Sequence, residues 1–368
     1  MKKKIAIDCF KLVKGEGASI GIYNYTKNLV ENLAHLNKFK IYIFGNKYNQ
    51  VDFDFEGVIF IDIDIKLRNK LTYLVWELFL VNKYIYMYNI ELTIFPRGYI
   101  PLFSLSKTVN IIHDLIPIYY YENFRDQINY FENFYIRHRL LSSIKNSDKT
   151  ITISNYSKEE ILKYLQDNNS ISVIYNGYNR LESIKSVFQG DKYIVAVSSD
   201  KYKHKNLLGI IETYVLYHEK VNNPMKLHLL GVKSLSSLNF HIKPSILNDI
   251  VLYKFIPDAE YIKIVENARV FLFLSLIEGF GFPPLEAMNL GVPVICSKNT
   301  SLAEVVSQGG VLVDPNDLNY IVEKIIQIDV DRFYRDNLIN NGYKNIERFK
   351  WETIIHKYSD EIRKQLEC

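Results

Sequence analysis

Short apolar runs alternate with helix-like stretches along almost the whole chain, and this alternation limits the possible folds more than any other feature. Residues 5–10 have the character of a buried strand, apolar residues then recur at helical spacing from Ile22 to Leu36, and the apolar run KIYIFG follows. This order is a β-α-β unit. Its repetition predicts a parallel sheet with helices on both faces, because successive parallel strands need a crossover connection.

The alternation forms two series. In the first, strands are predicted at residues 58–63, 93–95 and 109–113 and in KTITIS and ISVIYNGY, with helices at 70–88 and 131–144. After the polar segment NRLESIKSVFQGD, the second series contains the runs KYIVAVSS, MKLHLLG, IVLYKFI, ARVFLFLS, VPVICS and GGVLVD. The sequence therefore predicts two α/β domains.

The length of the chain agrees with two domains. A chain of 368 residues is too long for one ordinary core. The predicted N-terminal domain covers residues 1–180 and the predicted C-terminal domain covers 181–350, with the boundary between Asn179 and Asp191. A last helical stretch within 351–368 is expected to cross back onto the first domain.

Composition excludes several classes of protein. The formal net charge of +4 is too small to indicate a nucleic-acid partner, although it suits an anionic phosphate ligand. Cys9, Cys296 and Cys368 are few, odd in number and far apart, which favours neither a disulfide framework nor a thiolate metal site and agrees with a reducing cytoplasm. The basic N-terminus leads into a predicted strand and not a signal peptide, and no apolar run approaches the roughly 20 residues of a transmembrane helix.

The stretch LIEGFGFPPLEAMNLGVPVI combines two glutamates, Glu278 and Glu286, with a Gly-Phe-Gly loop and a double proline. Because proline is tolerated in the first turn of a helix, a short helix is predicted to start at Pro283 or Pro284 and to end before Gly291, with Glu286 in its first turn. The glycines of the loop allow its backbone to approach a ligand. Free amides and the helix dipole at such a position attract phosphate.

This stretch has other interpretations. Glu286 alone could merely complement the helix dipole, and Glu278 alone could be a solvated loop charge. A dinucleotide-binding loop would need a third glycine where Pro284 stands and an acidic residue roughly 20 positions further on, where Ser297, Lys298 and Asn299 stand. The dinucleotide interpretation therefore fails on both requirements.

The run EGFGFPPLEAM resembles the Glu-x7-Glu signature of the family 4 retaining glycosyltransferases of the GT-B fold. The resemblance extends over almost the whole chain, through GIYNYTKNL, NIIHDLIP, ITISNYSKEEI, VIYNGY, KHKNLLGII, SLAEVV, GGVLVDPND and RFKWE. It implies an α/β chain with two Rossmann-like domains facing a cleft. The first domain would then bind the acceptor, and the second would hold most of the nucleotide sugar.

The resemblance also implies roles for the residues of the signature. Glu286 would bind the ribose hydroxyls of the donor, and Glu278 would lie near the transferred sugar. The loop would bring its amides to the sugar hydroxyls and the pyrophosphate. Its substrate-binding residues would be Gly279, Phe280, Gly281 and Phe282.

A fixed cation is needed where negative charge develops on the leaving nucleoside diphosphate. The resemblance assigns this role to Lys205, in the segment SSDKYKHKNLLGII. The sequence departs from the family pattern here, because His204 occupies an arginine position and Ser199 stands where many members have a second arginine. Lys201 and Lys203 are candidates to compensate, Lys201 as a substrate-binding residue. Without the resemblance, KYKHK would be interpreted as a solvated surface face.

Two further sites are expected in the first domain. His113 is predicted at the carboxyl end of a strand, where open α/β sheets place ligand groups, and the resemblance implies that it contacts the donor sugar as a catalytic residue. Asp114 is expected to hold the adjacent loop. The glycines of GEGASIG, chiefly Gly17 and Gly21, would let the backbone approach the donor phosphate or the acceptor. Each feature could also be ordinary, a satisfied core histidine and a simple β-α turn.

Three Asp-x-Asp pairs resemble the metal-binding motif of the other large glycosyltransferase fold, and all three are discounted. They lie at residues 52–54, 62–64 and 329–331. In IFIDIDI the aspartates alternate with isoleucines, as in a strand with one solvated face. No cofactor and no metal are therefore expected.

On this resemblance the chain is expected to be a cytoplasmic, nucleotide-sugar-dependent, retaining hexosyltransferase that moves one sugar to a glycan acceptor. The variants HDLIP and KN resemble bacterial mannosyl- and rhamnosyltransferases of surface polysaccharide assembly, such as that of O-antigen, capsule or cell-wall glycan. Two alternatives stay open. They are a nucleotide-sugar epimerase of similar fold and a catalytically silent nucleotide-sugar-binding subunit.

A lipid-linked acceptor, met at the inner face of the cytoplasmic membrane, is expected from residues 118–145. There aromatic residues alternate with the basic residues Arg125, Arg137, His138, Arg139 and Lys145. Tyrosines favour the level of the lipid headgroups, and each basic residue near an anionic leaflet contributes roughly 1 kcal/mol. The aromatics could instead form the inner face of a core helix, but the basic residues are expected to be exposed.

Overall fold

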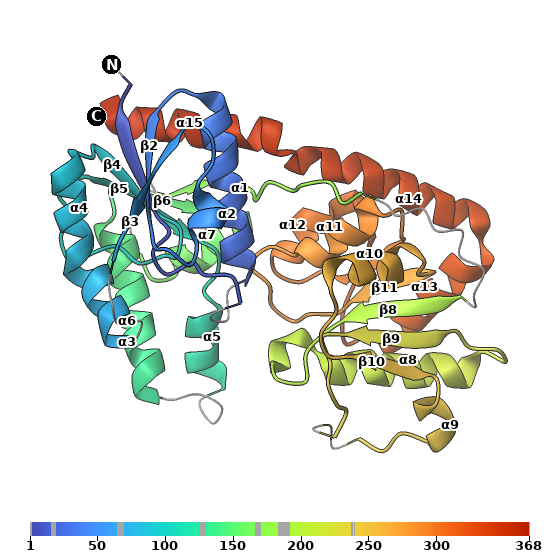
Figure 1. Ribbon diagram of the computed structural model, residues 1–368. Helices are drawn as coiled ribbons and strands as arrows, with labels where there is room; N and C mark the ends of the chain where they lie inside the picture. Colours follow the sequence, from blue (N-terminus) through green and yellow to red (C-terminus); the bar gives the residue numbers. More distant parts are fainter. Residues whose placement is uncertain are drawn as a thin grey trace. The chain divides into compact units, whose positions relative to one another are not determined.

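The computed structural model in Figure 1 contains two compact units. The first consists of Met1–Gly177 together with Trp351–Cys368, and the second is Tyr178–Lys350. The structure describes residues 2–15, 20–64, 70–124, 130–165, 171–182, 192–236, 238 and 240–367.

The first unit is built on a parallel sheet with the strand order β3-β2-β1-β4-β5-β6-β7. Its strands are β1 (Lys4–Asp8), β2 (Lys40–Gly45), β3 (Val58–Asp62), β4 (Leu92–Phe95), β5 (Lys107–Ile112), β6 (Lys149–Thr152) and β7 (Ile171–Val173). Each was predicted as an apolar run. The residues of β4 are all buried, as expected for a strand covered on both faces.

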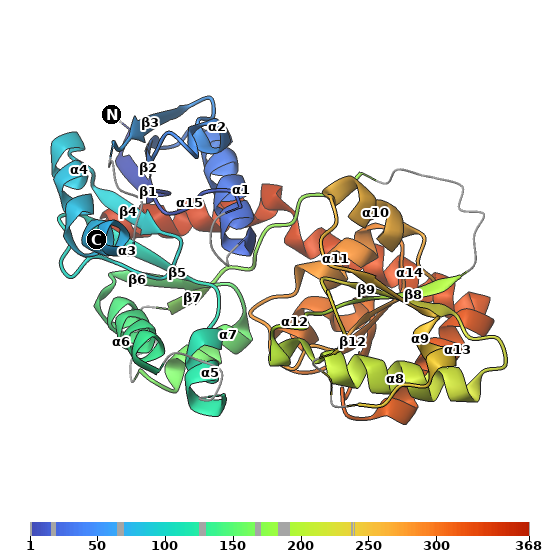
Figure 2. The same ribbon diagram turned by 60° about the horizontal axis from the view of Figure 1, so that its bottom comes forward.

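Helices cover both faces of this sheet (Figures 1 and 2). On one face lie α1 (Ile20–Leu36) and α15 (Trp351–Glu367); the other elements are α2 (Gln50–Phe53), α3 (Lys70–Val75), η1 (Trp76–Leu80), α4 (Val81–Tyr88), α5 (Ile116–Asn123), α6 (Tyr130–Asn146) and α7 (Asn155–Leu162). The predicted helix 70–88 is confirmed, with a π-helical turn at η1 in its middle. Helix α5 was not predicted, because its run IPIYYYEN has no helical periodicity.

Helix α15 is part of the core of the first unit although it follows the second unit in the chain. Its residues Ile354 and Ile362 are fully buried against α1 and the sheet. The hydroxyl groups of Tyr358 and Tyr25 lie 2.6 Å apart and form a buried hydrogen bond. At the first turn of α15, a Cβ on Gly177 would lie 2.1 Å from the ring of Trp351, so glycine is required at this contact.

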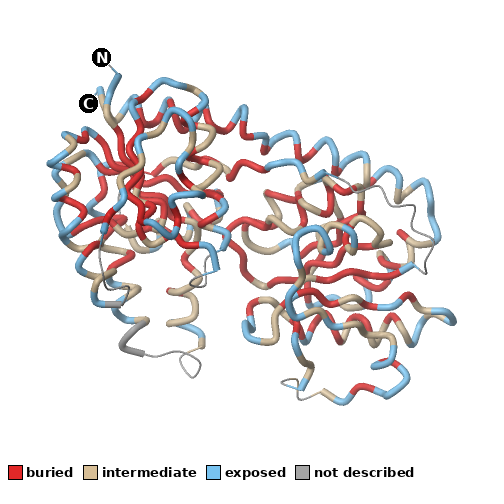
Figure 3. The backbone as a smooth tube through the Cα atoms, in the orientation of Figure 1, coloured by how far each residue is buried: buried red, intermediate tan, exposed pale blue. Residues whose placement is uncertain are grey.

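The second unit has its own parallel sheet, with the strand order β10-β9-β8-β11-β12-β13. The strands are β8 (Tyr193–Val197), β9 (Lys226–Leu230), β10 (Ile250–Tyr253), β11 (Val270–Phe273), β12 (Val294–Ser297) and β13 (Val311–Val313). The buried strands stand out in red in Figure 3. β11 and β12 are buried along their whole length, which explains why their sequences are apolar without alternation.

Helices again lie on both faces of the sheet. Helices α8 (Leu207–Lys220) and α13 (Leu318–Val330) pack on one face, and α10 (Asp258–Glu266), α11 (Phe282–Asn289) and α12 (Ser301–Val306) lie on the other (Figure 1). The remaining helices are α9 (Pro244–Leu247) and α14 (Arg332–Ile346), with short 3₁₀ turns at Lys203–Lys205, Ser307–Gly309 and Glu347–Phe349. The prediction of two Rossmann-like α/β domains is confirmed.

The strand order changes direction once in each sheet, between β1 and β4 in the first and between β8 and β11 in the second. Open α/β sheets bind ligands outside the carboxyl ends of the strands at such a point. In the second sheet, Lys205 follows β8 and Glu278 follows β11. The two predicted catalytic residues of the second unit therefore lie on the two loops that border the switch point.

Candidate active site

The loop after β11 enters helix α11 through Gly281. This residue has φ +118°, which side chains other than glycine rarely adopt, and a Cβ here would lie 2.6 Å from Leu302. The helix begins at Phe282, so the predicted start at Pro283 or Pro284 was one or two residues late. Since proline has no N–H, the amide donors at this end of the helix are those of Phe282 and of the preceding loop.

The prediction that Glu286 lies in the first turn of the helix was also wrong. With the helix starting at Phe282, Glu286 is its fifth residue, and the first turn contains no acidic residue. Glu286 therefore does not complement the dipole at the helix start. Its carboxylate instead accepts a hydrogen bond from the hydroxyl of Tyr261 at 2.5 Å.

Lys205 and Glu278 form an ion pair at the switch point, with 2.6 Å between Nζ and Oε1. The side chain of Glu278 is 11% exposed and that of Lys205 is 27% exposed. The ammonium group also lies 5.8 Å from the centre of the Phe273 ring. The side chain of Glu278 is thus more enclosed than that of Lys205, which stays partly exposed while paired with Glu278.

Hydrogen bonds fix the segment that carries Lys205 to the ends of β8 and β11. The hydroxyl of Ser198 donates to the carbonyl of Lys205 at 2.9 Å, and the amide of Leu276 donates to the carbonyl of His204 at 2.8 Å. Asn206 adopts the left-handed conformation, and its side chain accepts from the amide of Gly209 at the start of α8. These bonds hold the backbone around Lys205 rigidly beside the Glu278 loop.

His204 is buried, in contrast to the solvated face that the run KYKHK alone suggests. Burial, assisted by the positive charge of Lys205, lowers the pKa of His204 to about 4. The ring is therefore uncharged at neutral pH and does not replace the arginine of the family pattern as a cation. Lys201 is exposed on the same loop, with Nζ 5.2 Å from the centre of the Tyr202 ring.

Thr300 and Ser301, which follow β12, form hydrogen bonds with the backbone of the loop that contains Glu278. The amide of Glu278 donates to the Thr300 hydroxyl at 3.3 Å, and the Ser301 hydroxyl lies 2.8 Å from the carbonyl of Glu278 and 3.0 Å from that of Phe280. Thr300 has φ +59°, an uncommon conformation for a β-branched residue. The sequence alone did not point to these residues, although SLAEVV belongs to the family resemblance.

His113 lies directly after β5 in the first unit. Its Nε2 is 2.9 Å from the carbonyl of Pro96, which can only accept, so Nε2 carries the hydrogen and Nδ1 is the acceptor of the neutral ring. The Tyr25 ring packs edge-on against it. Burial lowers the pKa of His113 to about 4, so the ring is neutral at physiological pH. Asp114 accepts from the amide of Ile116 at the start of α5, as expected for a residue that holds this loop.

The glycine-rich loop of the first unit is described in part. Gly17 lies outside the described residues. Gly21 is the second residue of α1, and a Cβ there would meet nothing within 4 Å.

Two of the three discounted aspartate pairs, at residues 52–54 and 329–331, have structural partners. Asp52 forms an ion pair with Lys27, Asp329 accepts from Arg269 at 2.8 Å, and Asp331 caps helix α14. In the part of the chain that the structure describes, no three His, Cys, Asp or Glu side chains lie close enough to hold a metal ion.

Helix α6 differs in part from the predicted basic and aromatic surface. Arg139 is buried and donates to the carbonyl of Ile100 at 2.6 Å, so the expectation that it is exposed was wrong. A long helical side chain can turn inward when a buried carbonyl offers a partner. Phe134 and Tyr135, in contrast, are 50% and 42% exposed. Arg125 is outside the described residues, and no described helix is long and apolar enough to span a bilayer.

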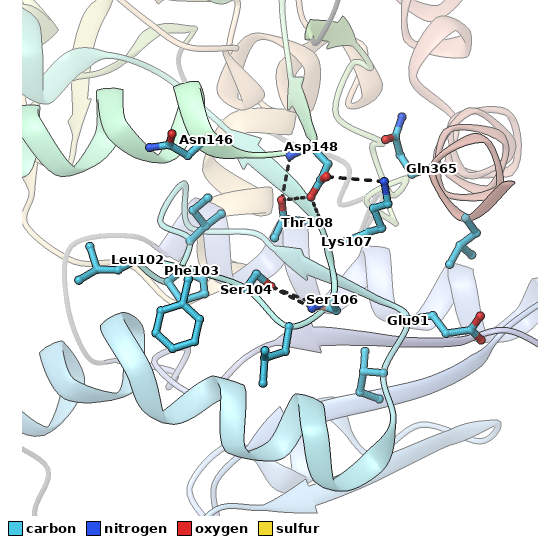
Figure 4. Close-up of a pocket in the computed structure, with 15 residues that line it drawn as sticks. Glu91, Leu102, Phe103, Ser104, Ser106, Lys107, Thr108, Asn146, Asp148 and Gln365 are labelled. Atoms are coloured by element: carbon cyan, nitrogen blue, oxygen red, sulfur yellow. Dashed lines mark hydrogen bonds and ion pairs between the residues drawn. The ribbon is translucent and has the colours of Figure 1, made fainter. Parts of the chain in front are cut away.

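A cavity of about 620 Å³ in the first unit is separate from these residues. It lies where β4, β5 and β6 begin (Figure 4). His113, in contrast, follows the carboxyl end of β5. Its polar groups bind each other, since Asp148 accepts from both the amide and the hydroxyl of Thr108. The cavity therefore contributes nothing to the candidate active site.

Comparison with solved structures identifies the fold. The whole chain superposes on sucrose-phosphate synthase from Thermosynechococcus elongatus with a TM-score of 0.71, covering 99% of each chain at 19% sequence identity. Such a likeness shows the fold, which is GT-B. The two doubly wound parallel sheets of this chain thus form a GT-B fold.

Two adjoining family models match the sequence. Residues 21–180 match Glycosyltransferase Family 4, and residues 179–345 match Glycosyl transferases group 1. The chain belongs to the family 4 glycosyltransferases of the GT-B fold.

Relatives of known function are similar over part of their length. O-antigen chain mannosyltransferase B of Escherichia coli is 27% identical over 278 residues, which cover 70% of each chain. O-antigen chain mannosyltransferase RfbU of Salmonella typhimurium is 30% identical over 224 residues, which cover 59% of each chain.

Proposed function

We propose that this glycosyltransferase moves a single sugar from a nucleoside-diphosphate sugar to a glycan acceptor with retention of anomeric configuration. The observation that carries the proposal is the Lys205 and Glu278 pair beside the loop that enters α11. The bond between the sugar and the diphosphate breaks, and a new bond forms to an acceptor hydroxyl. The proton of that hydroxyl leaves with the nucleoside diphosphate.

Lys205 and the loop amides supply positive charge where the diphosphate departs. The ammonium group is held by Glu278, so it does not reorganise as negative charge grows on the leaving oxygen. The amides of Phe282 and of the loop before it would bind the phosphates. In this assignment Lys205 and the amides take the place of a metal ion.

Glu286 and His113 bind the donor in this proposal. The Glu286 carboxylate accepts from neighbouring ribose hydroxyls. His113 accepts a hydrogen bond from the transferred sugar through Nδ1, because Nε2 is used by Pro96. Glu278 would lie near the transferred sugar.

The names of the relatives support the donor class that we propose. Both are named O-antigen chain mannosyltransferases, which favours a mannosyl donor, with rhamnosyl as the second choice, and a role in bacterial surface polysaccharide synthesis. We propose a lipid-linked acceptor at the inner face of the cytoplasmic membrane. The exposed Phe134 and Tyr135 on α6 support a peripheral contact there.

Thermal denaturation with a panel of nucleotide sugars tests the donor site. The matching donor should raise Tm, and release of its nucleoside diphosphate should require an added acceptor. Retention is checked by NMR of the anomeric proton of the product. Conversion of the donor without acceptor would indicate the epimerase, and binding without turnover under any acceptor would indicate the silent subunit.

Sedimentation with vesicles of anionic phospholipid tests the membrane contact. Phe134→Ser on α6 should reduce binding at low salt, and Phe333→Ser, which removes an exposed phenylalanine from α14, is the matched control. Equal binding by both variants and the unchanged protein would contradict a contact through α6.

A further inference from the structure

The partner of Glu286 lies on a different helix and outside the signature stretch. Tyr261, the fourth residue of α10, donates its hydroxyl hydrogen to Oε2 of Glu286 at 2.5 Å. Both side chains are partly buried, and α10 and α11 lie on the same face of the second sheet. The bond therefore joins two neighbouring helices at the residue to which we assign ribose binding.

The bond restricts how the carboxylate can be presented. A glutamate side chain has three rotatable bonds, whereas the phenol of tyrosine is fixed by two, so Tyr261 holds Glu286 in one orientation. Within the described residues, Tyr261 is the one hydrogen-bond donor to this carboxylate. With Oε2 taken, Oε1 is the oxygen that remains for a ligand.

The surroundings of Glu286 oppose its negative charge. Burial raises its pKa, and the nearby carboxylate of Asp258 raises it further. The hydrogen bond from Tyr261 acts in the opposite direction and lowers the pKa. Tyr261 itself stays protonated, because burial and the charge of Glu286 raise its pKa well above the usual value. Tyr261 thus both orients the carboxylate and opposes the rise in its pKa.

We propose that Tyr261 is a positioning residue for the donor, holding Oε2 of Glu286 so that Oε1 accepts from the hydroxyls of the nucleotide ribose. This inference rests on the proposed function, because it needs Glu286 at the donor. It adds a residue that the signature does not contain.

The test compares Tyr261→Phe, Glu286→Gln and the matched control Tyr193→Phe. The Tyr193 hydroxyl donates to the carbonyl of Ile264 in the same helix α10 at 2.9 Å, so its loss loosens α10 without touching Glu286. The full-length variants are titrated calorimetrically with GDP, UDP and dTDP at several pH values. The nucleotide that binds the unchanged protein most tightly is used for the comparison.

Tyr261→Phe should weaken binding of that nucleotide about tenfold, the effect of roughly 1.4 kcal/mol. The loss should increase as the pH falls, because without its donor Glu286 becomes protonated at a higher pH. Turnover at saturating donor should change little. Tyr193→Phe should bind as the unchanged protein does, and the double variant Tyr261→Phe/Glu286→Gln should bind no more weakly than Glu286→Gln alone.

The two possible failures are distinguishable. If Glu286→Gln weakens binding but Tyr261→Phe does not, or if Tyr193→Phe is equally weak, the positioning role is overturned and the donor site stands. A pH profile of binding that Tyr261→Phe does not shift would also overturn it. If Glu286→Gln itself binds normally, the ribose assignment in the proposed function fails.

Discussion

The ion pair of Lys205 and Glu278 should have separate effects on stability and on turnover. Lys205→Ala leaves the carboxylate of Glu278 enclosed without its counter-charge. Breaking a fully buried pair costs roughly 3–5 kcal/mol, and an exposed pair contributes about 0–1 kcal/mol. With side chains 27% and 11% exposed, we expect an intermediate loss of about 2 kcal/mol in the free energy of unfolding. Tm should then fall by roughly 4–8 °C.

Lys205→Ala should also lower turnover, and a second substitution at Glu278 should not restore it. Removing one preorganised donor from a developing charge lowers kcat by roughly 10²- to 10³-fold. In the double variant Lys205→Ala/Glu278→Gln the orphaned charge is gone, so stability should largely return while kcat stays low. Glu286→Ala, in contrast, should mainly raise KM for the donor, by roughly tenfold to a hundredfold.

Thermal denaturation and steady-state kinetics on the four proteins measure both effects. Recovery of turnover in the double variant would refute the assignment, since Lys205 would then serve only to neutralise Glu278. Equal stability of Lys205→Ala and the unchanged protein would refute the ion pair itself.

Three further outcomes are expected. Activity should survive excess chelator, and its loss with recovery on added manganese would revive a metal site at one of the aspartate pairs. The pKa of His113 is lowered to about 4 in the folded state, so the free energy of unfolding should fall by up to about 3 kcal/mol as the pH drops from about 6.5 to about 4. His113→Asn should reduce this pH dependence, as measured by urea titrations at several pH values. Gly281→Ala should lower the urea midpoint of unfolding, because residue 281 has a positive φ and a Cβ there would contact Leu302. Gly21→Ala should not lower it, because a Cβ at residue 21 meets open space. Equal midpoints for the two variants would contradict the requirement for glycine at the start of α11.

The order of strands and helices could be read from the sequence because it depends on local periodicity. Runs such as KIYIFG and VPVICS are apolar over the length of a buried strand, and the structure forms β2 and β12 there. The presence of a loop and a helix start after β11 could also be predicted, since glycine and proline restrict or free the conformation of their own backbone. Helix boundaries were predicted less accurately. Because α11 begins at Phe282, Glu286 lies outside its first turn.

Partners distant in the chain were decided by the tertiary structure alone. Nothing in the periodicity of α6 distinguishes Arg139 from an exposed arginine, because its burial depends on the carbonyl of Ile100, which belongs to another segment. The same holds for Lys205 and Glu278. Sequence resemblance could nominate each of them, but their ion pair exists because β8 and β11 are neighbours in the sheet.

Tyr261 is the clearest example of a residue whose role the sequence alone could not predict. It lies in an ordinary amphipathic helix with no motif around it, and its only distinguishing property is the carboxylate it meets. A sequence specifies which faces of its elements are apolar, and burial of those faces determines how the elements pack. The chemistry of a site depends on distances of a few ångströms between side chains from different elements, and these are set only once the sheet has brought the elements together.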